Sequence, residues 1–553
     1  MKIEVLQLNY EIGNFEANSV RILSAYFSAI KKGAELVICS ELSLSGYPPR
    51  DLLLRDEFFS QQDEVINKLC NAVGEIGLIV GVALRDSGKI YNSAILIHNH
   101  SYKVVSKKTL LPNYDVFEER RFFTSNDDVP IFFSYGKEEL RFCVLICEDI
   151  WLASFIKNQN YQGYDNQKDP VEKIIGKVDC LVVLNASPFE VGKQEVRFKI
   201  VAEVAKRIRA GVVYVNQIGG NDELIFDGTS VYVNQHSKII KVLKSFCEDC
   251  QTIDLMAVKI SITPPIDLIG SIYEALVLGI RDYISKTKGP KSVLVGLSGG
   301  IDSAVVAALA TAALGKQFVE AIFLPSMFSS IDSANDAKEI ASLLKIKYSE
   351  IPIESIYSSF AATLKSRIGW KTPGEDKSDV TEENVQARIR GVILMAIANR
   401  KRLMVLNTSN KSEISVGYGT LYGDMIGGLA VIADIYKWQV YDLARYINNI
   451  EQVIPSRVIS KQPSAELYPG QKDSDSLLPY KTLDEIIQLY VEGGAGIEEI
   501  STRIKISKEI ISDTIKKING SEFKRRQFPL ALRVSKKAFG IGRHFPIAAR
   551  FLV

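Results

Sequence analysis

KSVLVGLSGGIDS, residues 291–303, is the stretch on which the interpretation of the whole chain depends. Val293, Leu294 and Val295 form a short apolar run, which predicts a strand buried on both faces. The glycines and serines that follow predict a tight loop, and residues 304–314 have the composition of a helix. Backbone N–H groups at such a helix N-terminus lack partners within the helix and bind anions. The stretch therefore predicts a phosphate-binding loop; the alternative is a glycine turn that only packs a helix against a sheet.

SGGIDS, residues 298–303, resembles the pyrophosphate loop of the N-type ATP pyrophosphatases, which adenylate a substrate and release pyrophosphate. It does not fit the Walker pattern, because no lysine follows Gly300. The resemblance implies that ATP is bound by a run of eight residues: Gly296, Leu297, Ser298, Gly299, Gly300, Ile301, Asp302 and Ser303.

Length and composition narrow the class of protein. A chain of 553 residues is too long for one core and predicts two large domains, or about three to four ordinary ones. A net charge of +2 gives no case for a nucleic-acid or membrane surface. No apolar run approaches the ~20 residues of a membrane span, and the N-terminus lacks a secretory pattern. We therefore expect a cytoplasmic protein with neither nucleic acid nor membrane as a partner.

Histidines and cysteines are few. With only 4 His, the sequence disfavours a histidine-based triad or a zinc site, and 7 Cys in so long a chain do not predict a disulfide framework. Cys247 and Cys250 form a lone C-x-x-C without a second pair, and their role stays open.

The first half of the chain alternates strand and helix patterns, which predicts a layered α/β sandwich. Helices are expected at residues 18–32, 61–75 and 193–210. Strands are expected at residues 3–8, 35–39, 78–84, 93–98, 102–106, 140–146, 180–184, 212–216 and 229–233.

Three residues in this half follow strands or lie in loops where chemistry could occur: Glu41, Lys108 and Cys147. Backbone N–H groups at a strand end can stabilise a thiolate, a carboxylate can accept its proton, and a lysine can offset an oxyanion. Taken singly, each has a plainer interpretation, as a cap, a solvated charge and a core thiol respectively.

The contexts SELSLSGYPP, KTLLPNY and LICEDIW resemble the three active-site segments of the nitrilase, or carbon–nitrogen hydrolase, family. The resemblance implies an α-β-β-α sandwich in which Glu41 is the general base, Lys108 stabilises the oxyanion and Cys147 is the nucleophile. NASPFEVGKQEVR, residues 185–197, resembles the region after the nucleophile. In members that hydrolyse glutamine, the matching residues Tyr114, Ser187 and Lys193 would contact that substrate.

ISITPPID, residues 260–267, is the expected domain boundary, because Pro264 and Pro265 stiffen the connection. We expect one domain at residues 1–260 and another at 268–553. In the second, helices are expected at residues 272–285, 332–344 and 382–402, and strands at 319–324 and 403–406. Strands alternating with helices predict a doubly wound parallel sheet, whose ligands bind at the carboxyl ends of the strands.

Two carboxylates fall at such strand ends, Asp302 after the first and Glu413 after the strand at 403–406. Phosphate chemistry needs Mg²⁺ held by oxygen ligands, and these two residues are the candidates. The alternative is that each only caps the helix that follows it.

Four further stretches resemble the ammonia-transferring domain of NAD synthetase: residues 381–391, 406–437, 463–480 and 523–547. The resemblance implies that Asn384, Glu413 and Lys524 contact deamido-NAD and that Thr408 contacts ATP. The chain departs from the family pattern at two places, which are Leu530 after Phe528-Pro529 and the DSDS run at 473–476. Neither lies in the predicted phosphate loop or includes the candidate metal carboxylates or the three candidate catalytic residues.

Together the halves resemble the glutamine-dependent NAD synthetase family, apart from the joint. The resemblance implies that glutamine, deamido-NAD and ATP are the small-molecule substrates, that Mg²⁺ is required, and that the protein is a homo-oligomer. Two alternatives stay open. One is a related ATP-dependent amidotransferase acting on another carboxylate, and the other is an ammonia-only NAD synthetase with a non-catalytic first domain.

Overall fold

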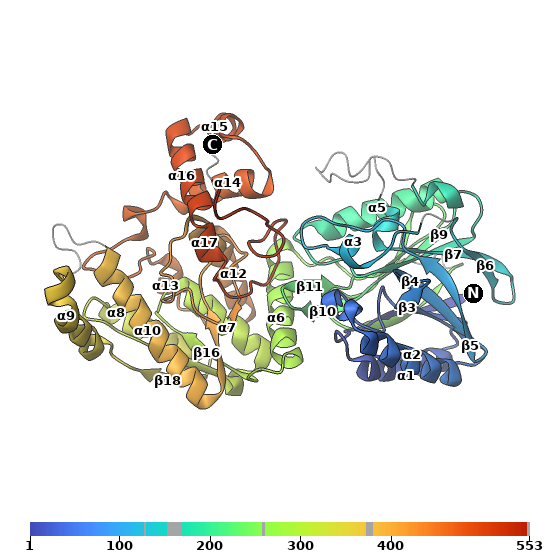
Figure 1. Ribbon diagram of the computed structural model, residues 1–553, viewed down its shortest axis with the longest axis horizontal. Helices are drawn as coiled ribbons and strands as arrows, with labels where there is room; N and C mark the ends of the chain where they lie inside the picture. The colour runs from blue at the N-terminus through green and yellow to red at the C-terminus, as the bar shows by residue number, and fades with distance from the viewer. Residues whose placement is uncertain (127–128, 152–168, 257–259, 372–379, 550–553) are drawn as a thin grey trace. The chain divides into compact units, whose positions relative to one another are not determined.

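The structure is a computed structural model that describes residues 1–126, 129–151, 169–256, 260–371 and 380–549 (Figure 1). The chain divides into two compact units, Met1–Ile266 and Asp267–Val553. In the described parts of the chain, no helix is both long and apolar enough to cross a bilayer.

The first unit contains a six-stranded and a seven-stranded sheet. The six-stranded sheet has the order β14 (Asp249–Asp254), β1 (Lys2–Gln7), β2 (Leu36–Ile38), β3 (Gly77–Asp86), β4 (Lys89–His98) and β5 (Ser101–Lys107). The seven-stranded sheet has the order β15 (Ser261–Ile262), β13 (Ile239–Val242), β12 (Val231–Val233), β9 (Gly211–Asn216), β8 (Cys180–Asn185), β7 (Leu140–Ile146) and β6 (Phe132–Tyr135). A small hairpin joins β10 (Ile218–Asn221) to β11 (Leu224–Asp227).

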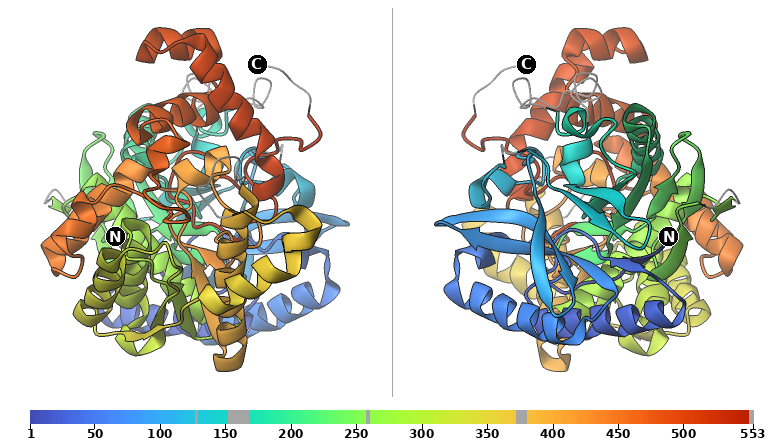
Figure 2. Two further views of the ribbon diagram at one scale, coloured as in Figure 1. Left: turned by 90° about the vertical axis from the view of Figure 1, so that its left-hand side faces the viewer. Right: turned by 90° about the vertical axis from the view of Figure 1, so that its right-hand side faces the viewer.

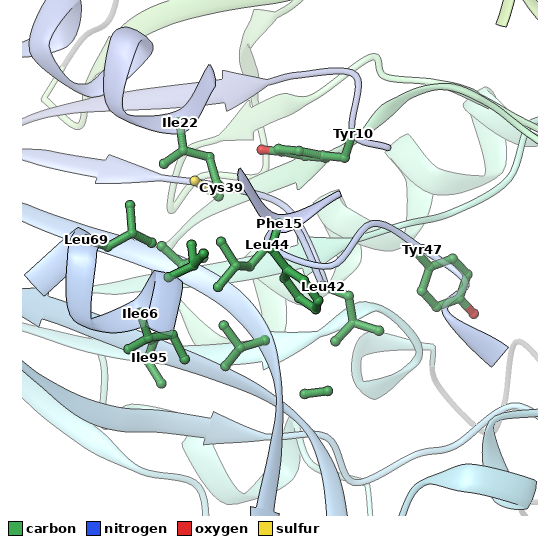
Figure 3. Close-up of a cluster of buried hydrophobic side chains, with 14 of the residues drawn as sticks. Tyr10, Phe15, Ile22, Cys39, Leu42, Leu44, Tyr47, Ile66, Leu69 and Ile95 are labelled. Carbon is green, nitrogen blue, oxygen red and sulfur yellow. The ribbon is translucent and has the colours of Figure 1, made fainter. Parts of the chain in front are cut away.

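Alternation along the strands builds three cores. Ile79 of β3 faces Val144 and Val182 of the other sheet, whereas its neighbours Leu78 and Val80 face outward. The outward face is covered by α1 (Phe15–Lys31) and α2 (Asp56–Ala72), which lie side by side (Figure 2). Figure 3 shows Ile22 of α1 and Leu69 of α2 in this outer core.

The seven-stranded sheet is covered in the same way by α5 (Lys193–Ile208), which packs its own apolar core on that sheet. Helix, sheet, sheet and helix therefore follow one another, and the predicted α-β-β-α sandwich is confirmed. The remaining short elements of this unit are η1 (Arg50–Leu54), α3 (Glu119–Phe122), η2 (Cys147–Ile150) and η3 (Glu172–Ile174).

The second unit is built on a five-stranded parallel sheet, as the alternation of strands and helices predicts. Its order is β18 (Lys347–Glu350), β17 (Val319–Phe323), β16 (Ser292–Gly296), β19 (Leu403–Asn407) and β20 (Leu429–Ala430). Leu294 of β16 packs against α10 (Val380–Lys401), while α7 (Ile301–Leu314) packs with α6 (Leu268–Lys286) and α12 (Lys437–Ile450).

The strand order reverses direction between β16 and β19, the neighbouring strands at the centre of the sheet. A crevice forms at such a switch point, outside the carboxyl ends of the strands, and ligands of open α/β sheets bind there. The remaining elements of the unit are η4 (Lys316–Phe318), α8 (Ile331–Leu343), α9 (Glu354–Ile368), α11 (Lys411–Val416), α13 (Ser456–Ser460), η5 (Asp473–Asp475), α14 (Tyr480–Ile487), η6 (Gln488–Glu492), α15 (Ile497–Ile504), α16 (Lys508–Gly520) and α17 (Glu522–Arg525).

Candidate active sites

Cys147 lies where β7 ends and η2 begins, in the left-handed backbone region with φ of 46°. Side-chain-bearing residues seldom adopt this conformation, so the surroundings must hold it. The buried Asp149 does so, because one carboxylate oxygen accepts from Ile146 N at 3.1 Å and the other from Leu110 N at 2.7 Å. The same side chain therefore fixes both the nucleophile turn and the segment that carries Lys108.

Lys108 is enclosed between two carboxylates. Its Nζ donates to Glu41 Oε1 and to Glu119 Oε1, each at 2.8 Å, and its side chain is 0% exposed. Burial raises the pKa of Glu119 to about 7; the Lys108 charge opposes this rise and the Glu41 charge adds to it. Tyr47 also donates to Glu119 Oε1, at 2.9 Å.

Glu41 is held on both of its oxygens. Asn92 Nδ2 donates to Oε1 at 2.7 Å, and Ala186 N donates to Oε2 at 2.9 Å. Burial raises the pKa of the Cys147 thiol well above its usual value; Glu41 raises it further and Lys108 lowers it. The thiol is therefore protonated at rest, and reaction needs a base to take its proton.

The residues that the resemblance assigns to glutamine lie on segments next to this cluster. The Tyr114 hydroxyl donates to Oε1 of Glu148, the residue after the nucleophile, at 2.8 Å. Ser187 follows Ala186 and its N–H donates to Asn216 Oδ1 at 2.9 Å. Lys193 begins α5, with Nζ 5.9 Å from the centre of the Trp151 ring.

A cavity of about 740 Å³ lies at the switch point of the second unit. This volume falls in the range of about 300–1,000 Å³ that small-molecule sites occupy. Its lining includes Thr408, Asn384, Glu413 and Lys524, together with every residue of the predicted phosphate loop except Gly299.

Gly299 serves the loop's shape, since it has a φ of +79° and its Cβ position lies 2.3 Å from Ser333 O. The loop is further held by Ser303, whose Oγ accepts from Ser298 N at 3.2 Å and donates to Gly300 O at 3.0 Å. Gly300 is the N-cap of α7, so the N–H groups of the first turn begin at this loop.

Lys437 joins the two candidate metal carboxylates. Its Nζ lies 2.5 Å from Asp302 Oδ2 and 3.1 Å from Glu413 Oε1, and its side chain is 2% exposed. Burial raises the pKa of Glu413 to about 7; the Lys437 charge opposes the rise and the Asp302 charge adds to it.

Neither carboxylate caps a helix. Gly300 occupies the cap of α7, and Asn410 caps α11 by accepting from Glu413 N at 3.0 Å. Asn410 also donates to Asp302 Oδ1 at 2.9 Å, which holds that carboxylate beside the second strand-end loop. The two side chains are thus available to the cavity rather than to a helix end.

The remaining predicted residues lie around the loop at 417–424. Asn384 Oδ1 accepts from Thr420 Oγ1 at 2.6 Å, and Lys524 Nζ donates to the carbonyls of Gly417 and Gly419, each at 2.8 Å. The basic run at 524–526 is not simply a solvated patch, because the buried Arg525 pairs with Glu522.

Some residues of these sites were not predicted from the sequence: Glu119, Glu148 and Lys437, together with Arg390, which lines the cavity. A lysine directly after the apolar run that ends at Tyr436 was a signal for Lys437; nothing local distinguished Glu119 from Glu118. Cys247 is exposed and Cys250 is half-buried, and their role stays open. Across the described residues, no cluster of three or more His, Cys, Asp or Glu could hold a metal.

Comparison with known proteins gives matches to both units. The carbon-nitrogen hydrolase family matches residues 2–259, and the NAD synthase family matches residues 272–528. The glutamine-dependent NAD(+) synthetase of Synechocystis is 40% identical over 565 residues, covering 99% of each chain. That of Acinetobacter baylyi is 38% identical over 554 residues, covering 99% of this chain and 98% of the other.

Among solved structures, glutamine-dependent NAD+ synthetase from Acinetobacter baumannii, in complex with adenosine diphosphate, matches with a TM-score of 0.75. It is 36% identical, over 99% of this chain and 98% of that one. Both clusters of side chains described above lie within the matched regions, and the two relatives align with the chain across both regions. The chain belongs to the glutamine-dependent NAD(+) synthetase family.

Proposed function

We propose that this chain makes NAD(+) from deamido-NAD, with glutamine as the nitrogen donor and ATP as the activating substrate. The first unit hydrolyses glutamine to glutamate and ammonia. The second adenylates the nicotinate carboxylate of deamido-NAD, releases pyrophosphate, and replaces AMP with ammonia. Family membership supports the reaction; the division of labour rests on the two clusters of side chains.

In the first unit, Glu41 takes the thiol proton as Cys147 Sγ attacks the side-chain amide carbon of glutamine. Lys108 offsets the negative charge on the tetrahedral oxygen. The carbon–nitrogen bond breaks, and Glu41 returns the proton to the leaving nitrogen as ammonia departs. Water, deprotonated by Glu41, then breaks the thioester to give glutamate, and the sulfur regains its proton. Glu119 keeps Lys108 charged and in place throughout.

Recognition of glutamine falls to Tyr114, Ser187 and Lys193. Lys193 offers a cation to the substrate's α-carboxylate, and the Tyr114–Glu148 pair is a suitable partner for its α-ammonium. The position of Glu148 directly after Cys147 supports a role for this pair beside the attacked amide.

In the second unit, residues 296–303 and Thr408 bind ATP, with the loop N–H groups and the Ser298 and Ser303 hydroxyls on its phosphates. Asn384, Glu413 and Lys524 bind deamido-NAD. Its carboxylate attacks the α-phosphorus, pyrophosphate leaves, and the acyl adenylate then reacts with ammonia to give the amide and AMP.

Asp302 and Glu413 would hold Mg²⁺ in the place that the Lys437 ammonium takes between them. Two carboxylates at the edge of a polyphosphate cavity fit Mg²⁺, which commonly takes one or two carboxylates and completes its shell with phosphates and water. Bound there, the ion would offset the charge of the departing pyrophosphate.

The observation that carries the proposal is a pair of buried salt bridges, in which Lys108 binds both Glu41 and Glu119 on segments beside Cys147. A domain kept only as a scaffold has no reason to hold three buried charges, each of which is costly to remove from water. This observation supports an active glutaminase over the ammonia-only alternative.

The test supplies ATP, Mg²⁺ and deamido-NAD with either glutamine or ammonium to the intact protein, to Cys147→Ala and to Cys247→Ala. We expect Cys147→Ala to lose NAD(+) formation from glutamine and to keep it from ammonium, while the exposed Cys247→Ala changes neither. Equal loss from both nitrogen sources in Cys147→Ala contradicts the division of labour. If the intact protein amidates another carboxylate but not deamido-NAD, the related amidotransferase is the correct assignment.

We also propose that the enzyme works in the cytoplasm as a homo-oligomer. Only 7 Cys in a chain of 553 residues do not make a disulfide framework, which supports a reducing compartment. Val392 and Met395 on α10 are 68% and 40% exposed, which supports a surface that another copy covers. Light scattering of the purified protein tests the oligomer.

A further inference from the structure

Arg390 lines the same cavity as the phosphate loop, at the carboxyl edge of the parallel sheet. Its Nε donates at 2.9 Å to the carbonyl of Leu324, the residue that follows β17. One turn further along α10, Leu394 Cδ1 lies 3.2 Å from the position of a Cβ on Gly296, where the loop begins. The guanidinium is therefore fixed beside the ends of β16 and β17.

The terminal nitrogens of Arg390 form no ion pair within 4 Å in the described part of the structure, where its only hydrogen bond is the one from Nε to Leu324. Glu466 and Asp424 are the carboxylates that act on it electrostatically. Glu466 is occupied by Ser330 and Ser333, at 2.8 and 2.7 Å, and Asp424 by Thr420 N, at 2.7 Å. Burial accordingly lowers the pKa of Arg390 to about 10.

The other cations that line the cavity are each engaged. Lys437 lies between two carboxylates, Lys524 donates to two carbonyls, and Lys461 donates to Ser333 at 2.6 Å. A half-buried cation without an ion-pair partner is partly desolvated at a cost in free energy, and an anion that pairs with it offsets that cost. Arg390 thus has the setting of a ligand-binding residue rather than of a structural one.

The face of α10 that lines the cavity extends from the proposed deamido-NAD contact at one end to the phosphate loop at the other. Asn384, proposed to contact deamido-NAD, precedes Arg390 by about 9 Å along the helix axis, whereas Leu394, against Gly296, follows by about 6 Å. Arg390 therefore lies nearer the loop proposed to hold the phosphates of ATP. The planar guanidinium, anchored through Nε, leaves its terminal nitrogens to bind a phosphate group with two parallel hydrogen bonds.

We propose that Arg390 binds the phosphates of ATP and stabilises the pyrophosphate as it leaves. The inference rests on the proposed ATP site at residues 296–303 and adds to it a cation from the opposite wall of the cavity. The phosphates of deamido-NAD present the same chemistry, and the experiment below distinguishes the two.

The test uses full-length Arg390→Gln and Arg390→Lys, with Arg400→Gln as the matched control, because Arg400 is exposed on the same helix and outside the cavity. Ammonium replaces glutamine so that only the second unit is assayed. We expect Arg390→Gln to lower kcat/KM for ATP by about 100-fold, because two charged hydrogen bonds are lost. Arg390→Lys should lose less, and kcat/KM for deamido-NAD at saturating ATP should fall much less.

Thermal unfolding distinguishes ligand binding from a structural role. Without nucleotide, Arg390→Gln should unfold near the temperature of the parent, because the half-buried guanidinium forms one hydrogen bond and no ion pair that the change would break. The stabilisation by α,β-methylene-ATP with Mg²⁺ should shrink in Arg390→Gln and stay unchanged in Arg400→Gln.

A lower unfolding temperature with undiminished nucleotide stabilisation in both Arg390 variants overturns the proposal, and so does a loss confined to deamido-NAD. If Arg390→Gln fails to fold, Arg390→Lys decides by the same measurements. An inactive parent protein with ammonium would instead refute the proposed function, whereas an active parent with an equally active Arg390→Gln refutes only this inference.

Discussion

Lys437→Met removes the ammonium that separates Asp302 from Glu413 and leaves two carboxylates side by side at the edge of the cavity. Methionine keeps much of the volume of the lysine stem, so the change is mainly one of charge. If the two carboxylates form a Mg²⁺ site, the variant should become dependent on Mg²⁺ for its stability, because a divalent cation can replace the lost charge.

The magnitude follows from the burial of the three groups. Lys437 is 2% exposed, and Asp302 and Glu413 are 20% and 16% exposed. Removing one partner of a buried ion pair costs about 3–5 kcal/mol, and the partial exposure places this case near the lower end. For a large domain, a loss of ~3 kcal/mol lowers the unfolding temperature by roughly 6–12 °C. Mg²⁺ at 100 times its Kd would restore about 2.7 kcal/mol.

The loss should also grow with pH. The pKa of Glu413 is about 7, above its ordinary value of 4.5, so this group favours the folded state at pH below 4.5 and loses that contribution as the pH rises through 7. Without the lysine, the pKa of Glu413 rises further. Lys437→Met should therefore be destabilised more at pH 8 than at pH 6.

The thermal unfolding temperature of the second unit, measured without ATP and in the presence or absence of Mg²⁺, tests this loss of stability. Lys516→Met is the control, because Lys516 pairs with Asp513 at the surface of the same unit, with both side chains more than half exposed, where such pairs contribute at most about 1 kcal/mol. Mg²⁺ should stabilise Lys437→Met strongly, and the parent and the control weakly. An equal effect of Mg²⁺ on all three proteins would refute the idea that the ammonium holds the metal's place.

Two other substitutions separate the sites. Glu119→Gln should lower glutamine-driven NAD(+) formation at least about 100-fold, since Lys108 loses one of its two carboxylate partners, and should leave ammonium-driven formation unchanged. Steady-state rates with both nitrogen sources check this, and unchanged glutamine use contradicts it. Gly299→Ala places a Cβ 2.3 Å from Ser333 O at a φ of +79°. It should lower the rate with either nitrogen source together with nucleotide affinity, measured by calorimetry, whereas a loss with glutamine alone contradicts the placement of the phosphate loop.

Much of the fold could be predicted because apolar alternation recurs along the chain. Residues 78–80 of β3 face two different cores in turn, and this pattern is visible locally. β14 escaped prediction, since DCQTID is polar and becomes a strand only by pairing antiparallel with β1, far away in sequence. Pairing of this kind is set by tertiary structure, which a local pattern does not contain.

The site residues also differ in whether the local sequence reveals them. Loop residues such as Gly299 and Gly300 can be recognised from the local sequence, because few sequences place a tight glycine turn after a buried strand. Glu119 does not, because it is buried only where Lys108 and Tyr47 come together, while the adjacent Glu118 is exposed. Nothing in the local sequence distinguishes one glutamate from the other.

The two units share an electrostatic arrangement that neither motif reveals. Lys108 lies between Glu41 and Glu119, and Lys437 lies between Asp302 and Glu413. In each, burial raises the pKa of one carboxylate, Glu119 or Glu413, to about 7. The lysines differ in what must follow. In the proposed mechanism Lys108 would have to stay, because the oxyanion of the tetrahedral intermediate would need a fixed cation. If Asp302 and Glu413 hold Mg²⁺ as proposed, Lys437 would have to yield, because the metal would need the same oxygens. This difference is why Glu119→Gln should act on turnover while Lys437→Met should act on Mg²⁺-dependent stability.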